Sequence, residues 1–214
     1  MLPLADLTLW LLTILVEAFV VYLFLIRGLF RKFLFLSFYL LLSVAISISG
    51  YAARSHFGYS SSEYRVFYYF SHALLTVVLF LSICELGVRL VGTKMFSRRV
   101  VLWSAGALLA MTWFSFSVAS SSDSNMMTHF YFELTQNIYY GCCLVVVLLW
   151  AWRVHNDPED RIAARFINVL TVYFSVFLLT YGARQLPPHL VNNLWVMTGA
   201  WLPFGCGFAI VFQE

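Results

Sequence analysis

Seven long apolar runs follow one another along the chain, and short polar connections separate them. A helix that crosses a bilayer needs about 20 mostly apolar residues. The runs of this length are 7–26, 33–53, 66–90, 100–119, 128–152, 162–183 and 193–212. No Lys or Arg precedes the first run, so we expect a retained helix and not a cleaved signal. The pattern predicts an all-α integral membrane protein whose residues 1–214 form a single seven-helix transmembrane domain.

The composition supports lipid as the surrounding solvent. Apolar residues make up 62% of the chain and charged residues only 11%. Soluble domains are about half apolar and about one quarter charged. A globule of 214 residues could not bury this much apolar surface. We therefore expect membrane lipids to be the main partners of its surface.

The distribution of the thirteen Lys and Arg residues predicts the orientation. Basic residues of membrane proteins gather on the cytoplasmic side. One set of alternate connections and helix ends holds Arg27, Arg31, Lys32, Arg89, Lys94, Arg98, Arg99, Arg153, Arg161 and Arg165. The other set holds Arg54, Arg65 and Arg184. We therefore place the N-terminus outside and the C-terminus inside, and this explanation of the net charge requires no nucleic-acid partner.

The predicted fifth span carries a polar stripe, which we define as His129, Glu133, Gln136, Asn137 and Tyr140. Residues three or four apart share one face of a helix. The orientation above puts this stripe in the outer half of the membrane. Polar groups at that depth turn toward other helices or a water-filled cavity. The third span offers two partners at similar depth, His72 and Thr76.

Two interpretations of the polar stripe remain open. In the first, Glu133, Gln136, Asn137 and His72 form a structural network of hydrogen bonds between helices. In the second, an outward-open pocket binds a small ligand, a lipid headgroup or an ion. Its predicted lining is Glu133, Gln136, Asn137, Tyr140, His72 and Thr76.

Three further residues are expected to be structural or to titrate protons: Glu17, Glu85 and His129. Glu17 lies near the membrane midplane and needs a partner, and the second span presents Ser43 and Ser47 on one face. Glu85 is expected to pair with Arg89, four residues later.

The lysine and histidine positions limit the cofactors. Retinal needs a lysine inside the last helix, whereas both lysines, Lys32 and Lys94, fall in predicted cytoplasmic connections. A b-type haem needs two facing histidines at one depth, and the only candidates within the spans are His72 and His129, of which His129 sits at the membrane interface. We therefore expect no cofactor and no metal ion. A pigment or b-type haem held by His72 is the alternative.

No motif of a hydrolase, a metalloprotease or a nucleotide-binding enzyme occurs in the chain. We therefore expect a non-catalytic protein that serves as a ligand-sensing module or as an accessory subunit of a larger membrane complex. Gly106 and Ala110 in the fourth span have the small-x-x-x-small spacing of a docking face for another membrane subunit. A small-solute or ion transporter is a further alternative. Whether a cytoplasmic output domain or partner accompanies the bundle stays open.

The segments "VEAFVVYLFL" at 16–25 and "ICELGVRLV" at 83–91, with the short basic first connection, carry a family resemblance. They resemble uncharacterised multi-span bacterial integral membrane proteins of unknown function. The resemblance covers roughly residues 1–90 and consists mainly of apolar positions. It implies a location in the bacterial inner (cytoplasmic) membrane and brings no activity with it.

Overall fold

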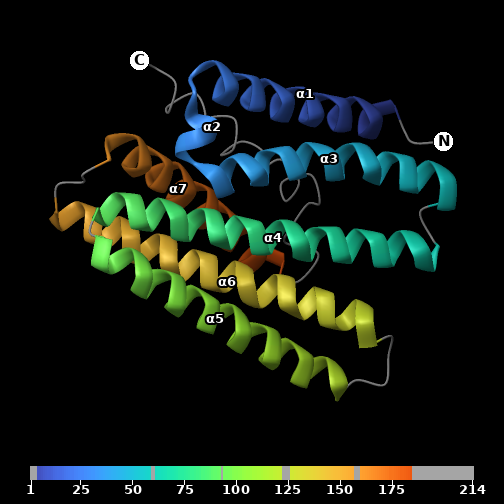
Figure 1. The fold of residues 1–214 in the computed structure, drawn as a ribbon. Coiled ribbons are helices and arrows are strands. Elements are labelled where there is room, and N and C mark those ends of the chain that lie inside the picture. Colours follow the sequence, from blue (N-terminus) through green and yellow to red (C-terminus); the bar gives the residue numbers. More distant parts are fainter. Residues whose placement is uncertain (1–3, 59–60, 93, 122–125, 157–159, 185–214) are drawn as a thin grey trace. The chain divides into compact units, whose positions relative to one another are not determined.

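The computed structural model describes residues 4–58, 61–92, 94–121, 126–156 and 160–184, and these residues are almost entirely helical (Figure 1). The helices are α1 (Leu4–Ile26), α2 (Leu29–Lys32), α3 (Leu34–Phe57), α4 (Ser62–Val91), α5 (Lys94–Ser120), α6 (Met126–His155) and α7 (Arg161–Arg184). Because α2 is a single turn, the six long helices correspond to the first six predicted spans. The predicted seventh span, 193–212, lies outside the described residues.

Four of these helices are long and apolar enough to cross a membrane. They are Leu34–Phe57, Ser62–Val91, Arg99–Ser120 and Met126–His155, found within the part of the chain that the structure describes. In α1 the apolar segment Ile14–Ile26 is shorter. The prediction of an all-helical protein is therefore confirmed for the described residues, and the four helices support a multi-pass membrane protein. The number of seven spans and the orientation stay predictions.

The chain divides into two compact units. The first consists of Met1–Glu85 and Ser97–Cys142, and the second of Leu86–Phe96 and Cys143–Glu214. The helices α4, α5 and α6 each contribute residues to both units. The single domain predicted over residues 1–214 stays a prediction. All contacts that position the candidate site belong to the first unit.

In the first unit, α1 packs along α3, and the one-turn helix α2 contacts both (Figure 1). The chain leaves α1 through Gly28, whose φ of 64° lies in the left-handed region. A residue with a Cβ atom adopts this conformation only at a cost, so glycine suits the reversal. The next residues turn inward, because Leu29 and Phe33 are buried. The predicted basic connection between the first two spans is thus partly helical and anchored by apolar side chains.

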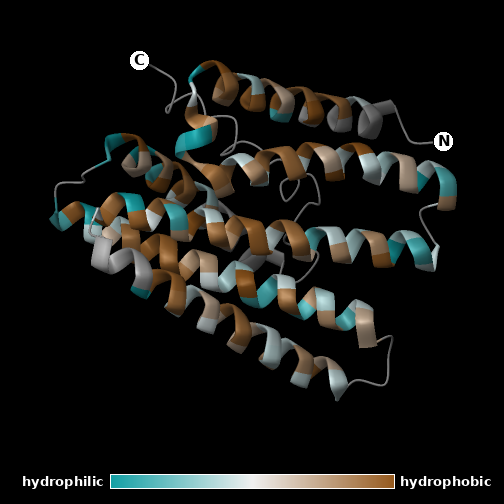
Figure 2. Cartoon of the chain, in the orientation of Figure 1, coloured by the Kyte–Doolittle hydropathy of each residue, from teal (hydrophilic) through white to brown (hydrophobic). Residues whose placement is uncertain are grey.

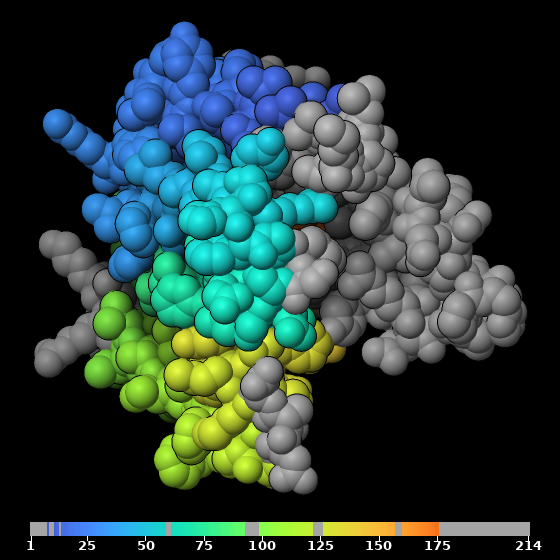
Figure 3. All heavy atoms as spheres, turned by 90° about the vertical axis from the view of Figure 1, so that its right-hand side faces the viewer, coloured from blue at the N-terminus to red at the C-terminus, as the bar shows by residue number. Residues whose placement is uncertain are grey.

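Contacts among α4, α5 and α6 form the rest of the first unit. The rings of Phe70 on α4 and Tyr131 on α6 lie 5.6 Å apart. Phe116 on α5 and Phe130 on α6 lie 6.3 Å apart. Figure 3 shows the first turns of α4 in cyan and of α6 in yellow at this end of the unit. Deeper in the unit Phe80, Ile83 and Ile138 are almost fully buried; they form its apolar core.

Large apolar side chains of α5 are exposed, and Figure 2 shows several brown, hydrophobic positions along this helix. Trp103 is 78% exposed, Leu109 72% and Trp113 73%. Such large apolar side chains are unfavourable in water but suit contact with lipid tails or another apolar helix. This exposure agrees with a helix at the membrane-facing side of its unit.

The second unit has its own apolar core and clear helix boundaries. Leu86, Leu90, Val146 and Ile167 are completely buried there. The Asp160 carboxylate caps α7, because its Oδ1 atom accepts hydrogen bonds from the backbone N–H groups of Ile162 at 3.0 Å and Ala163 at 3.3 Å. An acidic N-cap of this kind can be recognised in the sequence, because the capping residue directly precedes its helix.

Candidate functional site

The polar stripe lies in the first half of α6, where teal positions interrupt the apolar pattern in Figure 2. His129, Glu133, Gln136 and Asn137 are half-buried. Tyr140 differs from them, because it is 52% exposed. The predicted stripe therefore turns most of its polar side chains toward protein, as polar atoms in lipid require.

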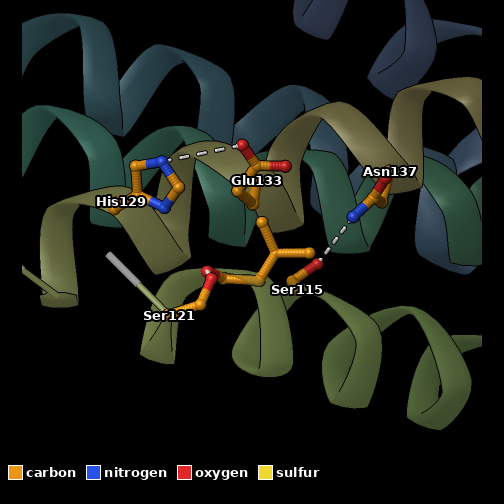
Figure 4. A network of polar contacts seen from close by, with 6 residues as sticks. Ser115, Ser121, His129, Glu133 and Asn137 are labelled. Atoms are coloured by element: carbon orange, nitrogen blue, oxygen red, sulfur yellow. Dashed lines mark hydrogen bonds and ion pairs between the residues drawn. The ribbon is translucent and has the colours of Figure 1, made fainter. Parts of the chain in front are cut away.

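Asn137 connects α6 to α5. Its Nδ2 atom donates a hydrogen bond to the Ser115 Oγ atom at 2.9 Å, as Figure 4 shows. The Ser115 hydroxyl in turn donates to the backbone carbonyl of Met111 at 2.7 Å. Ser115 is completely buried, so this bond lies inside the unit. Sequence reasoning missed Ser115, because one serine among several on α5 gives no sign of the direction in which it points.

His129 and Glu133 form a loose pair one helical turn apart. The His129 Nε2 and Glu133 Oε1 atoms lie 3.9 Å apart, and their side chains are 33% and 22% exposed. This distance is too long for a hydrogen bond. The attraction becomes an ion pair only when the imidazole is protonated. Figure 4 shows both side chains on the same side of α6.

The His129 ring has a further unused group. Its Nδ1 atom is buried and has no hydrogen-bond partner among the described residues. Buried polar atoms in native proteins nearly always have a partner, and the exceptions often mark functional positions. The imidazole ring and the carboxylate of Glu133 therefore have hydrogen-bonding positions that no described residue occupies.

The predicted partners on α4 make their described contacts within their own helix. The Thr76 Oγ1 atom donates to the backbone carbonyl of His72 at 2.7 Å. The His72 ring lies 4.4 Å from the ring of Tyr68, between centroids. The nearby ring contact between Tyr69 and Phe132, at 6.2 Å, places α4 beside α6. That His72 and Thr76 line a pocket with Glu133 stays a prediction.

Glu17 has the partners that the pattern of serines suggested. Its Oε1 atom accepts a hydrogen bond from the Ser43 hydroxyl at 2.7 Å, and its Oε2 atom accepts one from Ser47 at 3.1 Å. Ser43 and Ser47 are one turn apart on α3, so both reach the same carboxylate. Each oxygen of Glu17 is thus satisfied by the neighbouring helix, which makes its role in α1–α3 packing structural.

Glu85 has a role that the sequence did not indicate. Its Oε1 atom accepts a hydrogen bond from the backbone N–H of Leu34 at 2.8 Å. Its Oε2 atom accepts from the N–H groups of Phe35 at 2.9 Å and Leu36 at 3.4 Å. These donors are the free N–H groups of the first turn of α3, and the N-cap residue Phe33 provides no side-chain acceptor for them. Glu85 is therefore a helix cap supplied from another helix. Its expected pairing with Arg89 stays a prediction.

The predicted docking face on α5 is open in the first unit. Gly106 and Ala110 are exposed. A Cβ atom built on Gly106 would meet no heavy atom within 4 Å among the described residues. The small residues therefore do not serve to bring a described helix close.

Within the described ranges, no group of three His, Cys, Asp or Glu side chains could hold a metal ion. The arrangement on α6 instead offers hydrogen-bond acceptors and one carboxylate on a helix that also carries Phe130, Tyr131 and Phe132. Such groups can recognise a polar or charged ligand. Comparisons of the chain with protein-family models, with curated proteins and with solved structures find no match.

Proposed function

We propose that this protein is a non-catalytic membrane protein that senses a small ligand through the outer half of α6. The observation that carries this proposal is the loose pair of His129 and Glu133. The two groups are partly buried, yet they lie 3.9 Å apart. The imidazole also has a buried nitrogen without a partner among the described residues. A bound ligand would satisfy these groups.

A comparison of Glu133 with other polar residues of the helices supports its role in binding. Asn137 is anchored to Ser115 on α5, and Glu17 is saturated by two hydroxyls. A purely structural network would be expected to satisfy its members in the same way. Among the described residues Glu133 has no comparable hydrogen bond, although a carboxylate can accept several. We therefore favour the ligand-binding interpretation of Glu133 over the structural one.

Native mass spectrometry of the protein purified from its own membranes in mild detergent tests this function. We expect the wild-type protein to retain a small-molecule or lipid adduct that Glu133→Gln loses, because the substitution removes the charge without changing the shape. Glu63→Gln is the matched control, since Glu63 is exposed in the first turn of α4. Identical adducts on the wild-type protein and on Glu133→Gln would contradict the proposal.

We further propose seven spans in a bacterial inner membrane, with the N-terminus outside. This orientation is tested in a variant whose native cysteines are replaced by serine. A membrane-impermeant maleimide should label Ser61→Cys in intact cells, and should label Asn156→Cys only after permeabilisation. A fluorescent protein fused after Glu214 should fluoresce, as expected for a cytoplasmic C-terminus after an odd number of spans. The reverse labelling would contradict the orientation, and a dark, translocated fusion would contradict the span count.

A second candidate function, an accessory subunit of a membrane complex, is favoured by the exposed face of α5. The glycine at 106 and the large rings of Trp103 and Trp113 together form a surface on which another helix could pack. The two functions differ in what accompanies the purified protein. A small molecule held through Glu133 supports sensing, whereas a second chain held on α5 supports the accessory role.

A further inference from the structure

We infer that the ligand of the α6 site is an organic ammonium ion, either a free amine or the headgroup of a lipid. The inference rests on the proposed binding role of Glu133 and specifies the chemistry of what binds there. Its support comes from the charge, the rings and the access of the site.

The charge of the site favours a cation. No Lys or Arg occurs between Arg99 and Arg153, so the outer parts of α5 and α6 hold no permanent positive charge. Within α6 the partner of Glu133 is His129, which is charged only when protonated. On α4, which contacts α6 through Phe70, Arg65 lies in the first turns and is exposed. Among the described side chains, this half-buried carboxylate has no fixed counter-charge, and such a group attracts a cationic ligand.

The aromatic rings on the Glu133 side of α6 favour an organic cation over a metal ion. Phe130 lies three residues before Glu133, on the same side of α6. Its ring packs edge-on against Phe116 of α5, with centroids 6.3 Å apart. Aromatic faces attract substituted ammonium groups, which bring methyl or methylene surface as well as charge. Metal ions prefer several oxygen ligands instead, and the described residues contain no such cluster.

Several side chains near the site are exposed on the sides of α5 and α6. Phe116 is 47% exposed, Phe132 42% and Tyr140 52%, whereas Ser115 behind the site is fully buried. The amide of Asn137 gives its N–H to Ser115, which leaves its carbonyl oxygen able to accept from a primary amine. An ammonium group on an apolar body therefore fits this surface better than a fully hydrated ion does.

Binding of three isosteric probes separates charge from shape. The probes are choline, its neutral isostere 3,3-dimethyl-1-butanol and the anion 3,3-dimethylbutyrate, each titrated into the purified protein by calorimetry. If the ligand is a free amine, choline should be the only one of the three probes that binds, with Glu133→Gln weakening it at least about tenfold and Glu133→Asp less. Phe116→Leu should weaken it about threefold. Glu63→Gln should leave it unchanged.

A second experiment, with lipids in place of soluble probes, identifies the source of the ammonium group. The protein is placed in nanodiscs of phosphatidylglycerol containing a small share of phosphatidylethanolamine, and the retained lipid is measured after extraction. Enrichment of phosphatidylethanolamine that Glu133→Gln removes, with no choline binding, assigns the ligand to a lipid headgroup. Choline binding without enrichment assigns it to a free amine. Both results support the inference.

Two results would overturn the ammonium inference. One is Glu133-dependent binding of the alcohol or of the anion, which leaves the proposed sensing function intact but changes the ligand class. The other is that neither choline nor phosphatidylethanolamine binds through Glu133. The native adduct of the preceding experiment then decides separately whether the site binds any ligand. The unfolding temperature of each variant shows whether a lost signal reflects lost folding.

Discussion

Replacing Glu85 by leucine should lower the free energy of unfolding by about 2 kcal/mol, one of the two largest effects that we expect in this protein. The carboxylate accepts hydrogen bonds from the N–H groups of Leu34, Phe35 and Leu36. It also places a negative charge at the positive end of the α3 dipole. Leucine removes both and leaves the N–H groups without an acceptor at the start of an apolar helix. Unfolding in mixed micelles of increasing SDS fraction measures the change.

The size of the effect should follow the chemistry of the side chain at position 85. Glu85→Gln should cost about half as much as leucine, because its amide keeps one carbonyl acceptor but loses the charge. Glu63→Gln, an exposed glutamate of the same helix, should change the stability by less than about 0.5 kcal/mol. Equal stabilities of Glu85→Leu and the wild-type protein would show that the cap contributes nothing.

Gly141→Leu should destabilise the first unit by about 2 kcal/mol through overpacking. A Cβ atom on Gly141 would overlap the terminal methyl group of Met111 on α5, and would lie 3.3 Å from its sulfur and 3.9 Å from the ring of Phe80 on α4. Alanine should cost less, because the flexible end of Met111 can rotate away. A branched side chain of four carbons must separate α6 from α5. The same SDS titration measures the effect.

Gly106→Leu is the matched control, since no described heavy atom lies within 4 Å of a Cβ built there. It should leave the stability of the isolated chain unchanged. Met111→Ala should recover part of the loss in Gly141→Leu, because it removes the atoms that collide. A loss at position 106 as large as that at 141 would contradict the explanation by local packing.

The sequence predicted the helices well, because their signals are local. An apolar run of sufficient length has one favourable arrangement in lipid, in which every backbone N–H and C=O bonds within its own segment. The predicted ranges 66–90, 100–119 and 128–152 therefore lie within α4, α5 and α6, and the range 33–53 starts one residue before α3. Such reasoning also extends to some contacts between helices. The spacing of Ser43 and Ser47 placed both hydroxyls on one helix face, and both donate hydrogen bonds to the Glu17 carboxylate.

The candidate site was predictable only in part. The spacing of the polar stripe identified His129, Glu133 and Asn137 as one face of a helix, because helical periodicity alone decides which residues share a side. It did not indicate that Asn137 bonds to Ser115, or that among the described residues the partner of Glu133 is a histidine 3.9 Å away. Which neighbour each residue meets depends on the rotation and the vertical offset of α5 against α6.

By itself, then, the sequence determined that this protein is helical, that it belongs in a membrane, and which polar side chains its helices carry into the apolar layer. These properties depend on how each short segment is solvated, and each segment determines its own solvation independently of the others. Only the tertiary structure decided that Glu85 caps α3 across a separation of some fifty residues, that the end of Met111 packs against Gly141, and that His129 and Glu133 lie 3.9 Å apart. Such contacts depend on how the side chains of different helices pack together, and they cannot be predicted from any one segment alone.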